Sequence, residues 1–300
     1  MLLLVCILCA PMPPAKTDGF LVGGQHGLAF LDPDGKELSR ESGYTGKLSP
    51  DGKWLARLDR KEGDVKSTMI VKPRDGKGKA LTVPGVAVAA GEGFDCHWSA
   101  DSKRVLIVEQ KGDGERIVTT HQVFDLKTKK AVPLDLPAEF YGRDWSKDGK
   151  RLLGDWRERD DLRVCWLSAD GKGEPEFLTP EDEYGYGAKL SPDGTRLLLK
   201  AGGKKKGAQS RLVVMDLKTK KRTTLDEPGH TRGYCWSRDG QRVAYTWQKT
   251  PTAGDENAEW TTWLITCKAD GTESKRITSR TTEGPGDLVI RMWFWVVDWR

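Results

Sequence analysis

A short motif recurs at nearly constant spacing along this chain, and it restricts the possible folds more than any other feature. Each copy has an aromatic residue or leucine, then Ser-x-Asp, a Gly or Ser, a polar residue and an apolar stretch. The five copies carry Ser49, Ser99, Ser146, Ser191 and Ser237, at successive steps of 50, 47, 45 and 46 residues. Because such periods are typical of repeat architectures, we expect an array of equivalent units.

A second motif alternates with the first, and it consists of an apolar strand, a tight polar turn and another short strand. Several of its turns contain Asp-Gly, which is a hairpin signal because glycine accepts the positive φ that these turns require. The six copies occupy residues 30–38, 71–81, 124–132, 167–175, 215–223 and 267–275. Together the two motifs give four short antiparallel strands in each unit, and no segment of helical period separates them.

Four strands in a unit of about 45 residues are typical of a β-propeller blade. The first motif begins Trp-Ser-x-Asp at 98–101, 145–148 and 236–239. These copies resemble the WD-like repeats of the TolB-like propeller family, also found in the propeller domains of tricorn and prolyl-oligopeptidase-type proteases. WD40 repeats proper match less well, because the Trp-Asp dipeptide that marks them is absent. The resemblance covers residues 19–300, with neither the separate N-terminal domain of TolB nor a hydrolase domain.

The two ends of the repeat array complement each other. The second motif occurs six times and the first only five, so one unit lacks its first strand. Residues 19–22 match the second strand of a blade, whereas residues 295–300 resemble an aromatic first strand, and the 282 residues of 19–300 divide into six units of 47. We therefore predict an all-β, six-bladed β-propeller with four antiparallel strands per blade, closed by the C-terminal strand joining the first blade.

The first residues of the chain resemble an export signal. Residues 2–10 form an apolar run that is followed by Pro11, Pro13 and Pro14, although no Lys or Arg precedes it. We expect residues 1–17 to be a leader, residues 18–300 to form a single propeller domain, and the protein to be periplasmic or secreted. The alternative is a buried N-terminal strand in a cytoplasmic protein. No stretch reaches the roughly 20 apolar residues of a transmembrane segment.

One position of the repeat points to a candidate site. The inner strand of each blade lines the central channel of a propeller, so the residue just before the aromatic or leucine position is expected at the channel mouth. Around the ring these residues are Lys47, His97, Asp144, Lys189, Cys235 and Asp298. Five of the six can carry charge, which predicts a site for a small polar ligand, a cation or the charged terminus of a partner. The alternative is that each aspartate neutralises the lysine of the next blade.

Large apolar residues occupy the next position of the repeat. They are Trp98, Trp145 and Trp236 in three units and Leu48 and Leu190 in two others. A ring of such side chains at one depth packs neighbouring blades together, and we favour this interpretation over stacking of the indoles on a ligand.

The sequence carries none of the common catalytic or cofactor-binding patterns. A nucleophile elbow, a zinc-protease H-E-x-x-H, a P-loop and a dinucleotide fingerprint are all absent. No metal-binding spacing relates the histidines or the cysteines beyond the leader, which are His26, His97, His121 and His230, and Cys96, Cys165, Cys235 and Cys267. We predict no catalytic residues, metal or cofactor, and we expect these four cysteines to be buried free thiols. The net charge is only +5, which argues against a nucleic-acid partner.

Differences between the loops suggest where recognition takes place. The connections from second to third strands emerge on one face of the disc with the connectors between blades, and they vary most; examples are residues 60–66, 111–116, 202–208 and 249–259. Because recognition generally resides in variable loops on a rigid scaffold, we predict a monomeric, non-catalytic module that binds a protein or peptide on this face. The alternatives are a hydrolase- or lyase-type enzyme with its site at the channel mouth, and a regulatory propeller partner of a protease.

Overall fold

The computed structural model describes residues 18–24, 27–41, 45–59, 66–89, 93–112, 118–159, 161–204, 209–227, 229–248, 260–282 and 294–299. These residues form strands and turns. Within the described ranges, the chain has no helix that is long and apolar enough to cross a membrane. The predicted leader at 1–17 lies outside the described residues, as do His26 and most of the four variable loops.

The strands form four-stranded antiparallel sheets, which we number as blades in chain order. Blade 1 contains β24 (Phe294–Trp299), β1 (Phe20–Gly24), β2 (Gly27–Leu31) and β3 (Glu37–Glu41). Blade 2 contains β4 (Gly46–Leu48), β5 (Trp54–Asp59), β6 (Lys66–Pro73) and β7 (Leu81–Ala89). Blade 3 contains β8 (Gly93–Trp98), β9 (Arg104–Lys111), β10 (Val118–Asp125) and β11 (Lys130–Leu134).

The second half of the chain repeats the same order of strands. Blade 4 contains β12 (Phe140–Trp145), β13 (Arg151–Glu158), β14 (Asp161–Ser168) and β15 (Glu176–Phe177). Blade 5 contains β16 (Glu183–Leu190), β17 (Arg196–Gly203), β18 (Arg211–Asp216) and β19 (Arg222–Thr224). Blade 6 contains β20 (His230–Trp236), β21 (Arg242–Gln248), β22 (Trp260–Lys268) and β23 (Lys275–Thr282).

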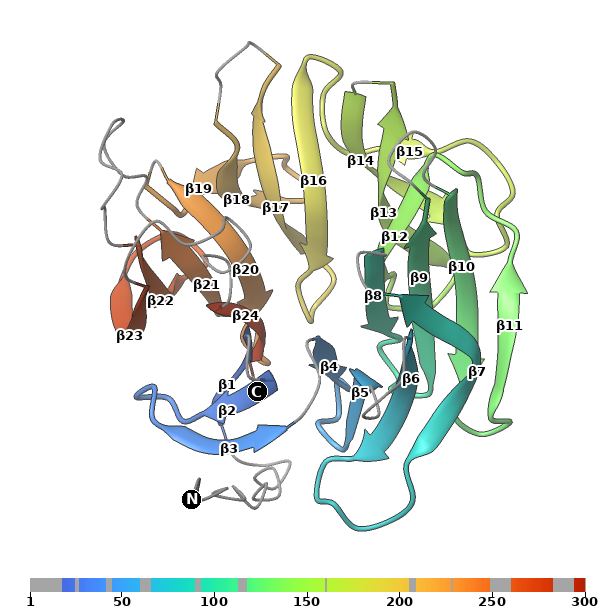
Figure 1. Ribbon diagram of the computed structural model, residues 1–300. Helices are drawn as coiled ribbons and strands as arrows, with labels where there is room; N and C mark the ends of the chain where they lie inside the picture. Colours follow the sequence, from blue (N-terminus) through green and yellow to red (C-terminus); the bar gives the residue numbers. More distant parts are fainter. Residues whose placement is uncertain are drawn as a thin grey trace, which may run out of the picture.

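The six blades surround a central axis, with β24, β4, β8, β12, β16 and β20 innermost (Figure 1). Strand β24, from the end of the chain, pairs antiparallel with β1, and Trp299 lies opposite Phe20 with ring centroids 5.0 Å apart. The predicted six-bladed propeller, with its closure by the C-terminal strand, is therefore confirmed. Closure gives β1 a paired neighbour, so blade 1 has the same four strands as the other blades.

The recurring Ser-x-Asp-Gly segment forms the turn between the first and second strands of a blade. In blade 4, Ser146 Oγ donates to Asp148 Oδ1 at 2.7 Å and accepts the backbone N–H of Arg151 at 2.9 Å. Gly149 adopts a φ of +69°, which explains the glycine of the motif. The blade 3 copy has Ser102 at this position with a φ of +61°, and its Oγ accepts the Asp51 N–H of blade 2 at 3.0 Å.

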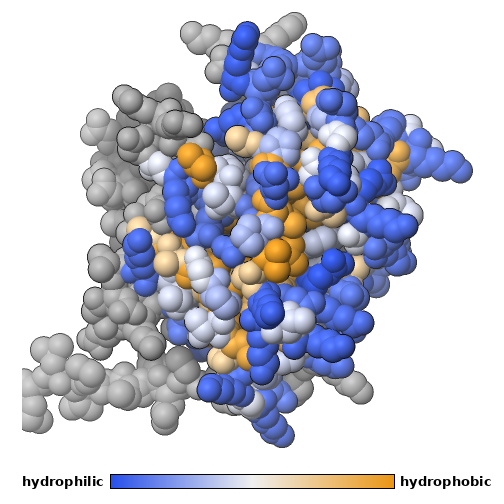
Figure 2. Space-filling model, turned by 90° about the vertical axis from the view of Figure 1, so that its right-hand side faces the viewer, coloured by the Kyte–Doolittle hydropathy of each residue, from blue (hydrophilic) through white to orange (hydrophobic). Residues whose placement is uncertain are grey.

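The apolar core lies between the blades. One cluster joins Met69 and Val71 of blade 2 to Trp98, Ile107 and Phe124 of blade 3, and all five are buried. Along the side of the disc, hydrophilic side chains cover most of the described surface, and apolar side chains show between them (Figure 2). Each sheet therefore buries both of its faces against its neighbours, which is the packing expected of a propeller.

Candidate functional site

The turns that follow the inner strands surround a cavity at one end of the central channel. The cavity has a volume of about 230 Å³, and its lining includes all six residues of the predicted ring, Lys47, His97, Asp144, Lys189, Cys235 and Asp298. Pro50, Ala100, Lys147, Pro192 and Gly194 of the Ser-x-Asp-Gly turns also line it. Because antiparallel pairing alternates the turns between the two ends of a blade, this cavity lies at the end opposite the predicted variable loops.

The two aspartates of the ring bind backbone amides across blade junctions. Asp144 Oδ2 accepts the N–H of Leu190 in blade 5 at 3.0 Å, and Asp298 Oδ2 accepts the N–H of Leu48 in blade 2 at 3.1 Å. In both, Oδ1 accepts the amide of the following residue, at 2.8 and 2.9 Å respectively. Burial raises the pKa of Asp144, and these amide hydrogen bonds oppose that shift. Among the described residues, Asp144 makes no ion pair with Lys189 at contact distance, although the charges of Lys47 and Lys189 also oppose the rise in its pKa.

At three other junctions a tryptophan indole makes the link. The Nε1 donors are Trp98, Trp145 and Trp236, and the acceptors are the carbonyl oxygens of Lys47, His97 and Lys189 in the preceding blade, at 3.0, 3.3 and 3.1 Å. The residue at the ring position of one blade is correlated with the large apolar residue of the next blade. At these five junctions that apolar residue is leucine where the ring residue is aspartate, and tryptophan where it is any other residue. The indoles thus join blades, as predicted, and they also line the cavity.

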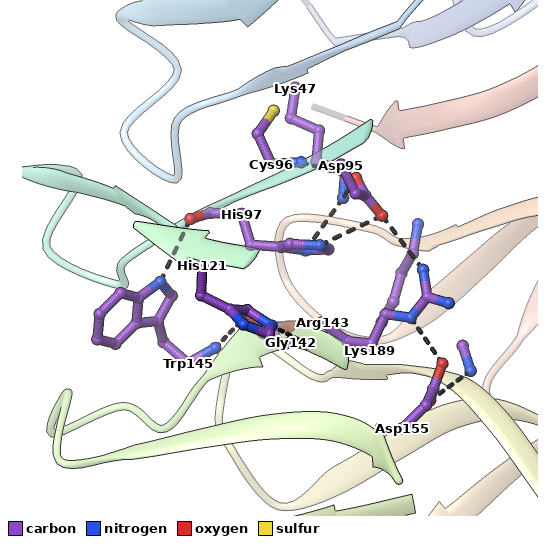
Figure 3. Close-up of polar contacts among 12 residues, drawn as sticks. Lys47, Asp95, Cys96, His97, His121, Gly142, Arg143, Trp145, Asp155 and Lys189 are labelled. Atoms are coloured by element: carbon purple, nitrogen blue, oxygen red, sulfur yellow. Dashed lines mark hydrogen bonds and ion pairs between the residues drawn. The ribbon is translucent and has the colours of Figure 1, made fainter. Parts of the chain in front are cut away.

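Asp95, two residues before His97 on β8, connects three channel side chains (Figure 3). Its Oδ1 accepts Lys47 Nζ at 2.8 Å, and its Oδ2 lies 3.2 Å from His97 Nε2 and 3.3 Å from Arg143 Nη1. Burial alone would raise the pKa of Asp95, but His97, Lys47 and Arg143 together outweigh it and hold that pKa well below its usual range. Asp95 is therefore a permanent anion behind the cavity wall.

His97 is a neutral member of this cluster. It is only 5% exposed, and burial lowers its pKa to about 4, against the opposing pull of Asp95. Its Nδ1 lies 3.1 Å from Lys47 Nζ, which assigns the acceptor role to Nδ1 and the ring proton to Nε2; Nε2 lies 3.2 Å from Asp95 Oδ2 but outside hydrogen-bond geometry. The imidazole therefore holds Lys47 in place rather than adding charge to the mouth.

Arg143 enters the channel because β12 bulges between Gly142 and Asp144. Its Nε donates to Asp155 Oδ2 at 2.7 Å, and Asp155 Oδ1 accepts the N–H of Gly187 in blade 5 at 2.8 Å (Figure 3). Asp155 is 2% exposed, so this pair links blades 4 and 5 in a poorly solvated environment. The guanidinium of Arg143 therefore forms ion pairs with two carboxylates, those of Asp155 and Asp95.

Lys189 differs from the other cations of the channel. Its Nζ donates to the backbone carbonyl oxygen of Tyr234 at 2.5 Å and lies 5.3 Å from the centre of the Tyr234 side-chain ring. In the described part of the chain, no carboxylate lies within ion-pair distance of it. Burial lowers the pKa of Lys189, and the charge of Lys47 lowers it further. The ammonium group of Lys189 is thus not paired with a carboxylate at contact distance, and Asp95 and Asp298 offset its charge only from farther away.

Sequence reasoning missed Asp95, Arg143 and Asp155. Asp95 could have been found, since it lies two residues before His97 and therefore shares its face of the strand. Asp155 interrupts an apolar second strand, which is a recognisable signal of a buried charge with a partner. Arg143 gave no such signal, because its direction depends on a bulge that the repeat spacing does not reveal.

The remaining candidate residues have structural surroundings. His121 is 4% exposed, and its Nε2 accepts the N–H of Gly142 at 3.1 Å. His230 is exposed at the start of β20. Within the described ranges, no group of three or more His, Cys, Asp or Glu side chains is arranged to hold a metal ion. The four cysteines beyond the leader are buried and free, as predicted; they are Cys96, Cys165, Cys235 and Cys267.

Comparison with known proteins agrees with this architecture. The chain has the fold of TolB from Acinetobacter baumannii, with a TM-score of 0.64 and 16% identity over 93% of this chain and 63% of that one. The structure of a putative TolB from Agrobacterium tumefaciens gives a TM-score of 0.63 and 15% identity, over 95% of this chain and 98% of that one. The described propeller is thus TolB-like in fold.

Comparison of sequences finds similarity over only part of the chain. No protein-family model matches the chain. A curated relative from Bacillus subtilis (strain 168), named uncharacterized peptidase YuxL, is 29% identical over 157 residues, which are 52% of this chain. The aligned part spans only 21% of that relative. These similarities concern the repeat and the fold of the chain, whereas its chemistry depends on the residues at the channel mouth.

Proposed function

We propose that this TolB-like propeller is a non-catalytic interaction module that binds a protein or peptide partner outside the cytoplasm, and that part of the partner enters the channel mouth. The observation that carries the proposal is the cavity of about 230 Å³ at the centre of the ring, to which five blades contribute their first turns or inner strands and blade 1 contributes Asp298. The apolar leader predicted at 1–17 supports the location outside the cytoplasm.

The size of the cavity favours a peptide side chain or chain end. Pockets for drug-sized ligands have volumes of roughly 300–1,000 Å³, so this one is small for a nucleotide or an oligosaccharide. Its wall combines indoles and Leu48 with lysine side chains, which gives an apolar body and a few polar contacts. The exposed residues around it, including Ala100 and Pro192, offer a surface on which the rest of a peptide can lie.

The wall of the cavity is rigid, because cross-blade hydrogen bonds hold it. Asp144, Asp298 and the indoles of Trp98, Trp145 and Trp236 fix the ends of the inner strands. A preorganised pocket loses little conformational entropy when it binds, which favours recognition of a short segment.

Site-specific photo-crosslinking tests this proposal. A photoreactive amino acid is placed at Ala100 on the rim, at Val132 on the outer strand of blade 3, or at Arg159 on the turn between the second and third strands of blade 4. All three positions are exposed. We expect a crosslinked partner from the extracytoplasmic fraction only with Ala100. Crosslinking only at Arg159 would support a partner on the variable-loop face instead, and crosslinking at no position would contradict the proposal.

An enzyme is the second candidate, since Lys47, Asp95 and His97 place groups capable of proton transfer beside the cavity, and the Bacillus subtilis relative is named a peptidase. A pKa of about 4 makes His97 a weak base at neutral pH, which counts against this alternative. Hydrolysis or elimination activity that is lost in His97→Gln, while the melting temperature is retained, would favour the enzyme over the binding module.

A further inference from the structure

The residues of the ring at the channel mouth join blades through their side chains, through their backbone, or through both. Asp144 and Asp298 use their carboxylates, which accept amides of blades 5 and 2. Lys189 instead uses its carbonyl oxygen, which accepts the Trp236 indole at 3.1 Å. Its Nζ also donates one hydrogen bond across this junction, to the carbonyl oxygen of Tyr234 at 2.5 Å, and the ammonium group has two further N–H donors for a ligand in the cavity.

A second lysine lies at the edge of the same cavity. Lys147, on the turn after β12, is exposed, and no ion pair involves it in the part of the chain that the structure describes. The other two cations of the lining, Lys47 and Arg143, contact Asp95 or Asp155. The cavity thus presents ammonium donors from two sides, at its wall and at its rim, whose charges are not paired with carboxylates.

The same geometry disfavours a cationic ligand. Each carboxylate oxygen of Asp144 and of Asp298 already accepts one backbone amide, which leaves less capacity for a cation, and lysine side chains line the cavity beside them. The described residues also contain no cluster of three or more acidic, histidine or cysteine side chains that suits a metal. An anion would instead gain charge-assisted hydrogen bonds and would offset the repulsion between Lys189 and Lys47.

A singly charged anion fits better than a doubly charged one. Asp144 and Asp298 lie in the lining with the lysines, and they would repel a phosphate dianion more strongly than a carboxylate. The apolar part of the wall, with Leu48 and Pro192, suits the aliphatic atoms next to a carboxylate.

We infer that the channel mouth binds a carboxylate of a peptide, with Lys189 as the half-buried donor in the wall and Lys147 as the donor at the rim. The inference rests on the proposed function and specifies its chemistry. The carboxylate has two sources in a peptide, the chain terminus and an Asp or Glu side chain, and the test separates them.

The test uses the full chain with ¹⁵N-labelled tryptophan and three N-acetylated pentapeptides. The first, Gly-Ser-Gly-Ala-Ala, has a free C-terminus, the second is the same peptide amidated, and the third is amidated and ends in Asp. Indole signals of Trp98, Trp145 and Trp236 report on the cavity, and Trp54 and Trp166, which do not line it, serve as internal controls. We expect shifts of the three cavity indoles with a peptide that carries a carboxylate, and none with the neutral peptide.

Substitutions then test the assigned donor. Lys189→Met should weaken binding of the carboxylate peptide roughly ten- to hundredfold, as expected for loss of a hydrogen bond between charged groups, and Lys189→Arg should retain it. The matched control is Lys150→Met. Lys150 is an exposed lysine of the turn that carries Lys147, and it does not line the cavity. If Lys189→Met does not fold, Lys147→Met at the exposed rim replaces it, with an expected loss of several-fold.

Several results would overturn the inference. These are equal binding of the neutral and charged peptides, no shift of the cavity indoles at millimolar peptide, stronger binding of inorganic phosphate than of either carboxylate, or unchanged affinity in Lys189→Met and Lys147→Met. The proposed function has a separate readout. A partner that crosslinks equally well from Ala100 in wild type and in Lys189→Met would preserve the interaction module and reject the carboxylate.

Discussion

Gly187 lies at the bulge of β16, where the backbone adopts a φ of +67°. A Cβ at this position would lie 2.2 Å from the hydroxyl oxygen of Tyr234, whose O–H donates to Gly187 O at 2.8 Å. We expect Gly187→Ala to lower the free energy of unfolding by about 2–4 kcal/mol, because left-handed strain adds to a steric clash. Urea denaturation measures the loss. Gly203→Ala is the matched control, since no atom lies within 4 Å of its added Cβ; equal losses in the two variants would contradict this account.

His121 couples folding to pH because the folded chain buries it in its neutral form. Burial lowers its pKa from the ordinary 6.5 to about 4, and its unprotonated Nε2 accepts the Gly142 N–H across the junction of blades 3 and 4. Between pH 6.5 and 4 the unfolded chain therefore binds a proton that the folded chain does not, so stability falls as the pH falls through this window. The pKa difference corresponds to at most about 3 kcal/mol.

His97 has a similarly lowered pKa, so the two histidines share this acid sensitivity. We expect His121→Gln to flatten the dependence of unfolding free energy on pH between 7 and 4.5, as measured by urea titration at several pH values. His230→Gln removes an exposed histidine and should leave most of the slope in place. A His121→Gln protein with the wild-type slope would show that His121 is not the source.

The inner strands of neighbouring blades are joined at the channel mouth by one of two side-chain hydrogen bonds, from a backbone amide to an aspartate carboxylate or from a tryptophan indole to a backbone carbonyl oxygen. Asp144→Ala removes the acceptor of the Leu190 amide, and we expect a loss of about 1–3 kcal/mol in unfolding free energy, the usual cost of leaving a buried donor without a partner. Glu139→Ala, at an exposed position just before β12, should change little. Asp144→Ala with unchanged stability would mean that the junction does not depend on the carboxylate.

A double variant tests whether the two kinds of hydrogen bond are equivalent. Asp144→Lys together with Leu190→Trp copies the junction between Lys189 of blade 5 and Trp236 of blade 6. The new indole can donate to the carbonyl oxygen of residue 144, so the pair should be more stable than Asp144→Lys alone. Thermal unfolding of both proteins measures the difference. A double variant less stable than the single one would contradict the equivalence.

The repeat made the blades predictable and left their side-chain partners open. The spacing of the serines, together with the period of two along each strand, placed Lys47, His97 and Lys189 at one depth of one channel. Hydrogen-bond partners were less accessible, because they lie in other blades. The bulge before Asp144 directs Arg143 into the channel, and a one-residue shift of this kind leaves no mark in the repeat spacing. At Asp144 the carboxylate oxygens accept backbone amides, and the charges of Lys47 and Lys189 act on the carboxylate without an ion pair at contact distance.

Closure makes the stability of every blade depend on the last strand. Each sheet packs against two neighbours, and blade 1 supplies both the first and the last described strands of the chain. Without β24, blade 1 loses its inner strand, and the apolar cluster that Val296 forms with Phe20, Cys235 and Ala244 opens between blades 1 and 6. Removal of residues 290–300 should therefore abolish the single cooperative unfolding transition seen by calorimetry, whereas an unchanged melting curve would refute the role of closure.

A circular permutant separates the packing of β24 from its position in the chain. Trp299 pairs with Phe20 in an antiparallel register, so residues 290–300 placed before residue 18 through a short glycine-rich turn can form the same pairing as a local hairpin. If closure depends only on the strand being present, the permutant regains the cooperative transition that the truncated chain lacks. A permutant that remains as unstable as the truncation would show that the order of the chain, and not only the added strand, is needed to close the propeller.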